Sequence, residues 1–281
     1  MADGAPANEV YHCLVISGGG AKGAYGAGAA EAIEAYRAKK KITNPLIYVG
    51  ASAGALNAYL LASAGADEAI RFWRAANNHN ILGAWVRWPF LNGLWGWVLS
   101  QIFRSKPFSI YSNEALKKLI AENVRLDDLQ APLVIAATDY TRGELRAFYE
   151  HTLVDAAVAE DAKLGDRARR LGHLRKVRSD DVLREGLLAS SAIPVFFPPV
   201  WIEVEHNGQM ERGWYVDGGV GNHTPTREAA YVLRYYFAKQ LNRPELFEKS
   251  VVYCISPDPP RTIQPKQRLK FLDILLRTQE V

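Results

Sequence analysis

The segments VYHCLVISGGGAKG (residues 10–23) and LIYVGASAGALNAYLLASAG (residues 46–65) decide the fold of this chain. Each begins with a short apolar run, Val10–Ser17 in the first and Leu46–Val49 in the second, and glycine follows each run. Short apolar runs bounded by glycine are typical of buried strands. The two segments therefore predict two strands that end in glycine-containing loops.

Small-residue stretches after these loops predict helices. Ala24–Lys40 is rich in alanine and ends in lysines, which suit the negative end of the helix dipole. Gly54–Ala64 is small and apolar, and Gly65 follows it as a helix stop. The order strand, loop, helix, strand, turn, helix is typical of parallel βαβ units.

The rest of the chain adds more strands and helices of the same kind. Further strands are expected at Leu133–Thr138, Glu144–Tyr149, Trp201–Glu205, Gln209–Val216 and Val251–Ser256, and helices at Asp181–Ser190, Thr226–Leu241 and Arg268–Arg277. The pair Asn207-Gly208 is a strong hairpin signal. Ala157–Asp181 is dense in charge and predicts an exposed helical excursion. Because no repeat or linker interrupts the pattern, we expect one α/β domain over residues 1–281.

Composition and charge exclude several classes of protein. Of the 281 residues, 48% are hydrophobic and 23% are charged, so the chain can bury a large core and global disorder is excluded. The formal net charge of +4 is compatible with an anionic membrane surface. The basic residues are scattered, without a recognisable nucleic-acid motif, so we expect no nucleic-acid partner.

The cysteines and the N-terminus indicate the compartment. Cys13 and Cys254 both lie in predicted strands, which does not suggest a disulfide framework and fits a reducing compartment. Met1–Val10 has neither a basic start nor an apolar run, so no secretory signal is expected. These features predict a cytoplasmic protein, with peripheral membrane contact left open.

One tryptophan-rich segment needs a separate interpretation. Ile81–Phe103 is apolar, but Arg87, Pro89 and several glycines interrupt it, so we do not expect a transmembrane span. The region Trp85–Trp97 is either a lid that places indoles at a lipid headgroup surface or a set of core aromatics under a loop.

Gly50-Ala51-Ser52-Ala53-Gly54 matches G-x-S-x-G between a predicted strand and a predicted helix. In that context a serine on a sharp turn projects its hydroxyl above the sheet edge, and the flanking glycines remove clashing side chains. The motif is short, and a small-residue packing turn is the simpler alternative. The surrounding elements favour a nucleophile at Ser52.

The glycine loop Gly18–Gly23 has three open interpretations. Consecutive glycines after a strand can aim several backbone N–H groups at an oxyanion or phosphate. Gly18, Gly20 and Gly23 also match the dinucleotide fingerprint G-x-G-x-x-G, but the acidic residue expected ~20 positions later is missing. A tight packing turn is the third interpretation.

Asp217-Gly218-Gly219 follows another predicted strand. An aspartate at a strand end, followed by two glycines, can lie in a cleft with little steric cover, although most Asp-Gly pairs are simple turns. A nucleophile, a loop rich in N–H donors and a carboxylate are together the parts that acyl transfer needs.

These motifs together resemble the patatin-like phospholipases, a family with a Ser–Asp dyad. Its G-G-G-x-[KR]-G oxyanion loop is matched by Gly18–Gly23, its G-x-S-x-G by Gly50–Gly54 and its D-G-[GA] by Asp217–Gly219. Its A-x-P-x-x-F-x-P element is matched by Ala192–Pro198, and Asn222–Pro225 matches its Asn-x-x-Pro loosely. The resemblance covers about residues 11–256.

The resemblance implies a three-layer α/β/α fold with a mainly parallel central sheet, and hydrolysis of lipid or phospholipid acyl esters without a metal or cofactor. It assigns the nucleophile to Ser52, the base to Asp217 and the oxyanion hole to the amides of Gly18, Gly19 and Gly20. Supporting roles fall to Lys22, which orients the loop, and to the other motif glycines: Gly23, Gly50, Gly54, Gly218 and Gly219. Burial is expected to raise the pKa of Asp217, which is otherwise too low for an effective base.

Two alternatives remain open. An α/β-hydrolase with a Ser–Asp–His triad needs a late histidine, and only His206 and His223 come late enough. A non-catalytic lipid- or nucleotide-binding module would keep the fold without the reactivity of Ser52.

Overall fold

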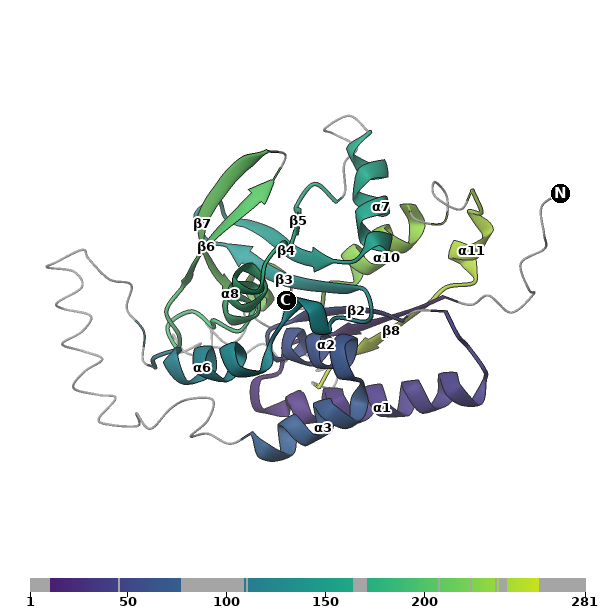
Figure 1. Ribbon diagram of the computed structural model, residues 1–281, viewed down its shortest axis with the longest axis horizontal. Coiled ribbons are helices and arrows are strands. Elements are labelled where there is room, and N and C mark those ends of the chain that lie inside the picture. The colour runs from purple at the N-terminus through teal and green to yellow at the C-terminus, as the bar shows by residue number, and fades with distance from the viewer. Residues whose placement is uncertain are drawn as a thin grey trace, which may run out of the picture.

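The computed structural model describes residues 11–76, 109–163 and 171–257, except residues 45, 110, 207, 223, 236 and 238–241. Within this part of the chain, eight strands form one sheet in the order β5-β4-β3-β2-β1-β8, and a β6–β7 hairpin attaches to β3 (Figure 1). The strands are β1 His12–Ile16, β2 Leu46–Ala51, β3 Leu133–Asp139, β4 Glu144–Glu150, β5 Leu174–Lys176, β6 Val200–His206, β7 Gln209–Asp217 and β8 Val251–Ile255.

Helices connect most of these strands. They are α1 Gly23–Lys39, α2 Ala53–Ala64, α3 Ala66–Ala75, α6 Glu114–Asn123, α7 Thr152–Ala162, α8 Asp180–Ser190, α9 Gly218–Gly221, α10 Thr226–Tyr235 and α11 Glu245–Glu248, with short 3₁₀ helices η1 Gly20–Lys22 and η2 Leu126–Asp128. The start of α8 illustrates their local determinants. The Ser179 hydroxyl accepts a hydrogen bond from the Val182 amide, and Asp180 and Asp181 complement the positive end of the helix dipole.

The centre of the sheet is parallel. β1 lies between β2 and β8, and β2 continues to β3, with all three pairings parallel. β4 runs antiparallel along the whole of one side of β3. The other side of β3 is shared, because β2 pairs with its first residues and β7, running antiparallel, pairs with its last ones.

Two hydrophobic clusters cover the two faces of this sheet. Alternate residues of β1 separate cleanly, with Leu14 and Ile16 in one cluster and Cys13 and Val15 in the other. The first cluster contains residues of α1, α2, α3, α6 and α8, and the second contains residues of α7, α10 and α11. Helices thus cover both faces (Figure 1). The three-layer α/β/α fold with a mainly parallel central sheet is confirmed.

The region Ala157–Asp181 was predicted to form an exposed helical segment, and its described residues differ from that prediction. α7 begins earlier, at Thr152, and the short strand β5 extends the sheet beside β4. Leu171 and Leu174 are fully buried, so β5 and the turn that precedes it contribute to the core. A three-residue strand is too short for a periodic sequence signal.

Among the described residues, no helix is both long enough and apolar enough to cross a membrane. The tryptophan-rich segment Ile81–Phe103 and the helix expected at Arg268–Arg277 lie outside the described residues.

Candidate active site

Ser52 occupies the sharp turn between β2 and α2. Its backbone is strained, with φ 55° and ψ −131°, a conformation that side-chain-bearing residues rarely adopt. Both flanking glycines are sterically required. A Cβ atom on Gly50 would lie 2.2 Å from the Gly54 carbonyl oxygen, and one on Gly54 would lie 2.1 Å from that of Ile16. The G-x-S-x-G motif therefore forms a sharp strand-to-helix elbow that lies against the end of β1.

Asp217 is the last residue of β7, and its side chain is almost completely buried. Burial raises the pKa of its carboxyl group to about 7, and the Ser52 side chain and the Gly219 amide partly oppose this rise. Oδ1 accepts a hydrogen bond of 2.7 Å from the Gly219 amide, whereas Oδ2 has no partner of regular hydrogen-bond geometry among the described residues. The carboxyl group thus keeps one oxygen available for a proton.

Strand β3 brings Ser52 and Asp217 together. Ala51, the residue before Ser52, pairs with Ala136, and Asp217 pairs with the next residue, Ala137. β2 and β7 therefore run towards each other along the same side of β3 and end at neighbouring positions. A Cβ atom on Gly218 would lie 2.3 Å from the Ala136 carbonyl oxygen and 3.3 Å from the Ala51 Cβ atom, which reflects how closely the two strand ends approach.

The glycine loop lies at the same edge of the sheet. It follows β1, whose last residue, Ile16, pairs with Gly50 of the neighbouring parallel strand. Gly20 has φ 53°, a conformation that favours glycine, and η1 packs against α2. No described residue accepts a hydrogen bond from the amides of Gly18, Gly19 or Gly20, so these three donors are available to a ligand.

Residues 14–230 match the family model described as patatin-like phospholipase. This chain belongs to the patatin-like phospholipase family. The match covers most of the chain, from β1 into α10, and includes the glycine loop, Ser52 and Asp217. The family is one of lipid acyl hydrolases.

Other comparisons add little to the family assignment. A comparison with curated proteins found no match. Among solved structures, VipD from Legionella pneumophila is similar over 75% of this chain, with 17% sequence identity and a TM-score of 0.37. The patatin-like chain spans 46% of the VipD chain, less than half of its length.

Sequence reasoning missed the residues that anchor the end of the glycine loop. Asn57 on α2 donates a hydrogen bond of 2.8 Å to the Gly23 carbonyl group and accepts one of 2.6 Å from the indole of Trp73 on α3. A Cβ atom on Gly23 would lie 2.1 Å from the Trp73 ring. Gly23, the last glycine of the patatin-like loop motif, is thus a packing site for an indole.

Ser190, the last residue of α8, and Ala192, two residues beyond it, were also missed as contacts of Ser52 and Asp217. The Ser190 hydroxyl accepts a hydrogen bond of 2.9 Å from the Ser52 amide, and the Ala192 carbonyl group accepts one of 2.9 Å from the Asp217 amide. Ala192 is the first residue of the A-x-P-x-x-F-x-P element, and Ser190 lies two residues before it, where no local pattern marked it. The start of that element and the helix end before it therefore lie against both predicted catalytic residues of this patatin-like chain.

Of the two histidines considered for a triad, only His206 lies within the described residues. His206 pairs with Gln209 at the far end of the β6–β7 hairpin, eight residues along β7 from Asp217. At ~3.3 Å per residue, this distance is roughly 26 Å, which is too long for a hydrogen bond. His223 lies outside the described residues, as does the region Trp85–Trp97.

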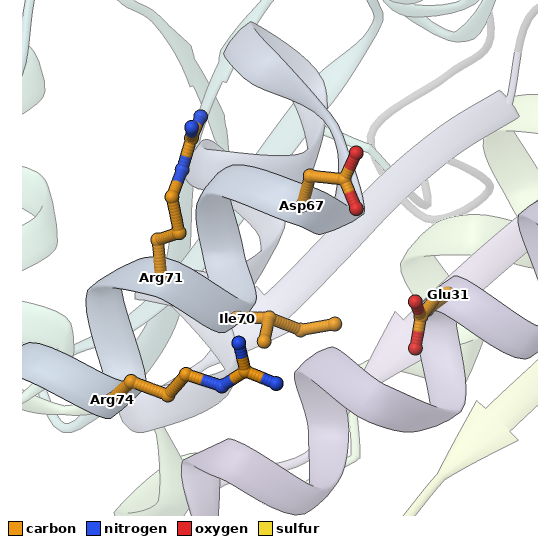
Figure 2. A pocket seen from close by; sticks show the side chains of 5 residues that line it. All are labelled: Glu31, Asp67, Ile70, Arg71 and Arg74. Atoms are coloured by element: carbon orange, nitrogen blue, oxygen red, sulfur yellow. The ribbon is translucent and has the colours of Figure 1, made fainter.

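A separate hollow lies between α1 and α3, away from the motif residues. Its volume is about 390 Å³, and its lining consists of Glu31, Asp67, Ile70, Arg71 and Arg74. Figure 2 shows Ile70 and Arg74 extending from α3 towards α1, which carries Glu31. None of these lining residues belongs to the glycine loop, the G-x-S-x-G motif or the Asp217 motif. Within the described part of the chain, no group of three or more His, Cys, Asp or Glu side chains could hold a metal ion.

Proposed function

We propose that this chain hydrolyses acyl esters of lipids, with phospholipids as the substrate class, through a Ser52–Asp217 dyad. The single observation that carries the proposal is the meeting of β2 and β7 on β3, which supports direct proton transfer between a strained serine and a buried carboxyl group. The pKa of about 7 for Asp217 supports its role as a general base, because a base works best when its pKa is close to the ambient pH.

The proposed reaction has two halves. Ser52 Oγ attacks the ester carbonyl carbon while Asp217 takes the hydroxyl proton, and Asp217 then returns that proton to the departing alcohol or lysolipid. Asp217 next takes a proton from water, which attacks the acyl-enzyme, and proton return to Ser52 Oγ releases the fatty acid.

The oxyanion of each tetrahedral intermediate is assigned to the free amides of Gly18, Gly19 and Gly20. Each such donor is worth roughly 3 kcal/mol in known oxyanion holes. The N-terminus of α2, which begins at Ala53, adds a positive dipole end beside the same oxygen. Donors of this kind compensate for the modest strength of a carboxylate base.

A dyad agrees better with the surroundings of Asp217 than a triad does. The groups that oppose the rise in its pKa are Ser52 and Gly219, and no described histidine acts on its carboxyl group. We therefore expect His223→Ala to keep the wild-type kcat/KM within about fivefold. Loss of several orders of magnitude in an ester-hydrolysis assay would instead favour a triad.

The test of the proposal is fatty-acid release from phospholipid vesicles and from a short soluble ester. Ser52→Ala is expected to abolish both activities, and Asp217→Asn to lower them by about 10²–10⁴-fold. Ser63→Ala is the matched control, because Ser63 is a buried serine on α2 whose hydroxyl donates to the Tyr59 and Leu60 carbonyl groups of the preceding turn. Activity that survives Ser52→Ala, or a wild-type chain inert towards every acyl ester, would contradict the proposal and favour a non-catalytic binding module.

A further inference from the structure

The pairing of β2 with β3 follows the regular parallel pattern up to the nucleophile. The Tyr48 amide donates to the Pro132 carbonyl group over 2.9 Å, and Tyr48 pairs with Leu133. In a parallel ladder such bonds recur every two residues along the strand. Four residues after Tyr48, this pattern would place a hydrogen bond from the Ser52 amide to the Ala136 carbonyl group.

That expected bond is replaced by a side chain. The Ser52 amide donates instead to Ser190 Oγ over 2.9 Å, and the Ser190 hydroxyl donates to the Ala136 carbonyl oxygen over 2.6 Å. One hydroxyl group is thus inserted into the ladder between β2 and β3. Ser190 is completely buried at the end of α8, so water does not compete for either bond.

The insertion occurs where β3 changes partner. Continued pairing of β2 would take Ser52 to Ala137, but Ala137 pairs with Asp217. A hydroxyl between Ser52 and Ala136 moves the serine away from β3 while keeping both buried backbone groups hydrogen-bonded. The side of β3 beyond Ala136 is then open to Asp217.

The same end of α8 also contacts the base. Two residues after Ser190, the Ala192 carbonyl group accepts the Asp217 amide over 2.9 Å. Ser190 and Ala192, two residues apart in one buried segment, therefore contact the backbones of both members of the dyad. The relative position of nucleophile and base depends on this segment as well as on the sheet.

We propose that Ser190 is a positioning residue of the active site, whose hydroxyl displaces the nucleophile from the β-ladder and fixes it at the correct separation from Asp217. This inference rests on the proposed function. It assigns no contact with substrate to Ser190, which acts through the Ser52 backbone.

The test compares Ser190→Ala with Ser191→Ala. Ser191 is the adjacent residue, and its buried hydroxyl has no hydrogen-bond partner among the described residues, so its removal controls for the loss of a buried oxygen. The readouts are the rate of covalent labelling by a fluorophosphonate, and kcat and KM for a short soluble ester over a range of pH. Folding is followed separately by chemical denaturation.

We expect Ser190→Ala to lower the labelling rate and kcat by about 10- to 100-fold, because small displacements of a nucleophile are costly. KM should change less than threefold. The pH at which activity rises should move upward, since a displaced Ser52 no longer opposes the raised pKa of Asp217. Ser191→Ala should behave as wild type.

If Ser190→Ala does not fold, Ser190→Cys provides the second variant, because a thiol nearly preserves volume but is a weak hydrogen-bonding group. A folded Ser190→Cys or Ser190→Ala protein with wild-type kcat, labelling rate and pH profile would overturn the inference. Equal losses in the Ser190 and Ser191 variants would also overturn it. Failure of the proposed function would look different from failure of this inference, because wild type and Ser191→Ala would then both remain unlabelled.

Discussion

A carboxylate with the ordinary pKa of aspartate, ~3.9, is a weak base for a serine hydroxyl. In this chain the side chain of Asp217 is buried, and its pKa rises to about 7. Burial therefore makes this carboxylate more basic, but it also means that a substantial fraction of the molecules carries a proton on Asp217 near neutral pH. Two predictions at the residue scale follow from this single environment.

The first concerns the dependence of activity on pH. Because only the deprotonated carboxylate can accept the Ser52 proton, kcat/KM for a soluble ester should rise as pH increases through about 7 and level off above it. Asp217→Asn should remove this transition from the residual rate. A profile already flat from pH 5 upward would mean that the essential base has an ordinary carboxyl pKa, contrary to the prediction.

The second concerns stability. The folded-state pKa of Asp217 exceeds its unfolded value, so the folded chain binds more protons between pH ~4 and 7, and this group's contribution to stability falls as pH rises through that window. Asp217→Asn removes the cost of a buried charge while its amide oxygen can still accept the Gly219 bond. The variant should be more stable than wild type at pH 8, on the order of 1 kcal/mol, and by less at pH 5. Urea denaturation at both pH values measures the difference, and a less stable variant at pH 8 would contradict it.

At the scale of elements, the site depends on close contact between strand ends and a helix start. The start of α2 lies against the backbone of β1, because Gly54 presents no side chain to the Ile16 carbonyl group. The strained Ser52 backbone lies at this helix start, in the turn between β2 and α2. The elbow is therefore a packing requirement as much as a chemical one.

Gly54→Ala should lower the free energy of unfolding by about 1–3 kcal/mol, because its methyl group overlaps a backbone oxygen that cannot move freely. Gly28→Ala on α1 is the matched control. Among the described residues, no atom beyond its neighbours and the backbone of its own helix lies within 4 Å of a Cβ atom at Gly28, and the substitution should be neutral or stabilising by up to ~1 kcal/mol. Equal effects of the two substitutions in chemical denaturation would show that the elbow tolerates a side chain.

At the scale of the whole molecule, the sequence predicted most of the strands and helices that carry the motifs. β1, β2 and α2 were predictable because each is an apolar or small-residue run with glycine at its end. β5 was not predictable, because a strand of three residues is too short to show a periodic hydrophobic pattern. The hydroxyl contact from Ser190 to Ser52 joins residues 138 positions apart, and no local pattern encodes such a contact.

The structure also shows which motifs lie close together in space. The residues of the glycine loop left three interpretations open, and its position beside the turn at Ser52 supports the proposed oxyanion role. The meeting of β2 and β7 on β3 was likewise unpredictable, because it depends on two strands sharing one side of a third.

Membrane contact is a prediction for the whole molecule. We propose that the region Trp85–Trp97 contacts the lipid surface, so Trp95→Ala combined with Trp97→Ala should lower binding to phospholipid vesicles about tenfold in a sedimentation assay. Trp201→Ala combined with Trp214→Ala is the control, because these two indoles contact each other on the β6–β7 hairpin and are also exposed, at 42% and 41%. A larger loss in the control pair, or none in the first, would refute the assignment.

The most direct test of the central claim, an Asp217-activated Ser52, is to map the site of fluorophosphonate labelling by peptide mass spectrometry. We expect one modified residue, Ser52, in the wild-type chain, no adduct in Ser52→Ala, and labelling slowed by about 10²–10⁴-fold in a folded Asp217→Asn protein. An adduct on another serine, or an Asp217→Asn protein labelled as fast as wild type, would contradict it.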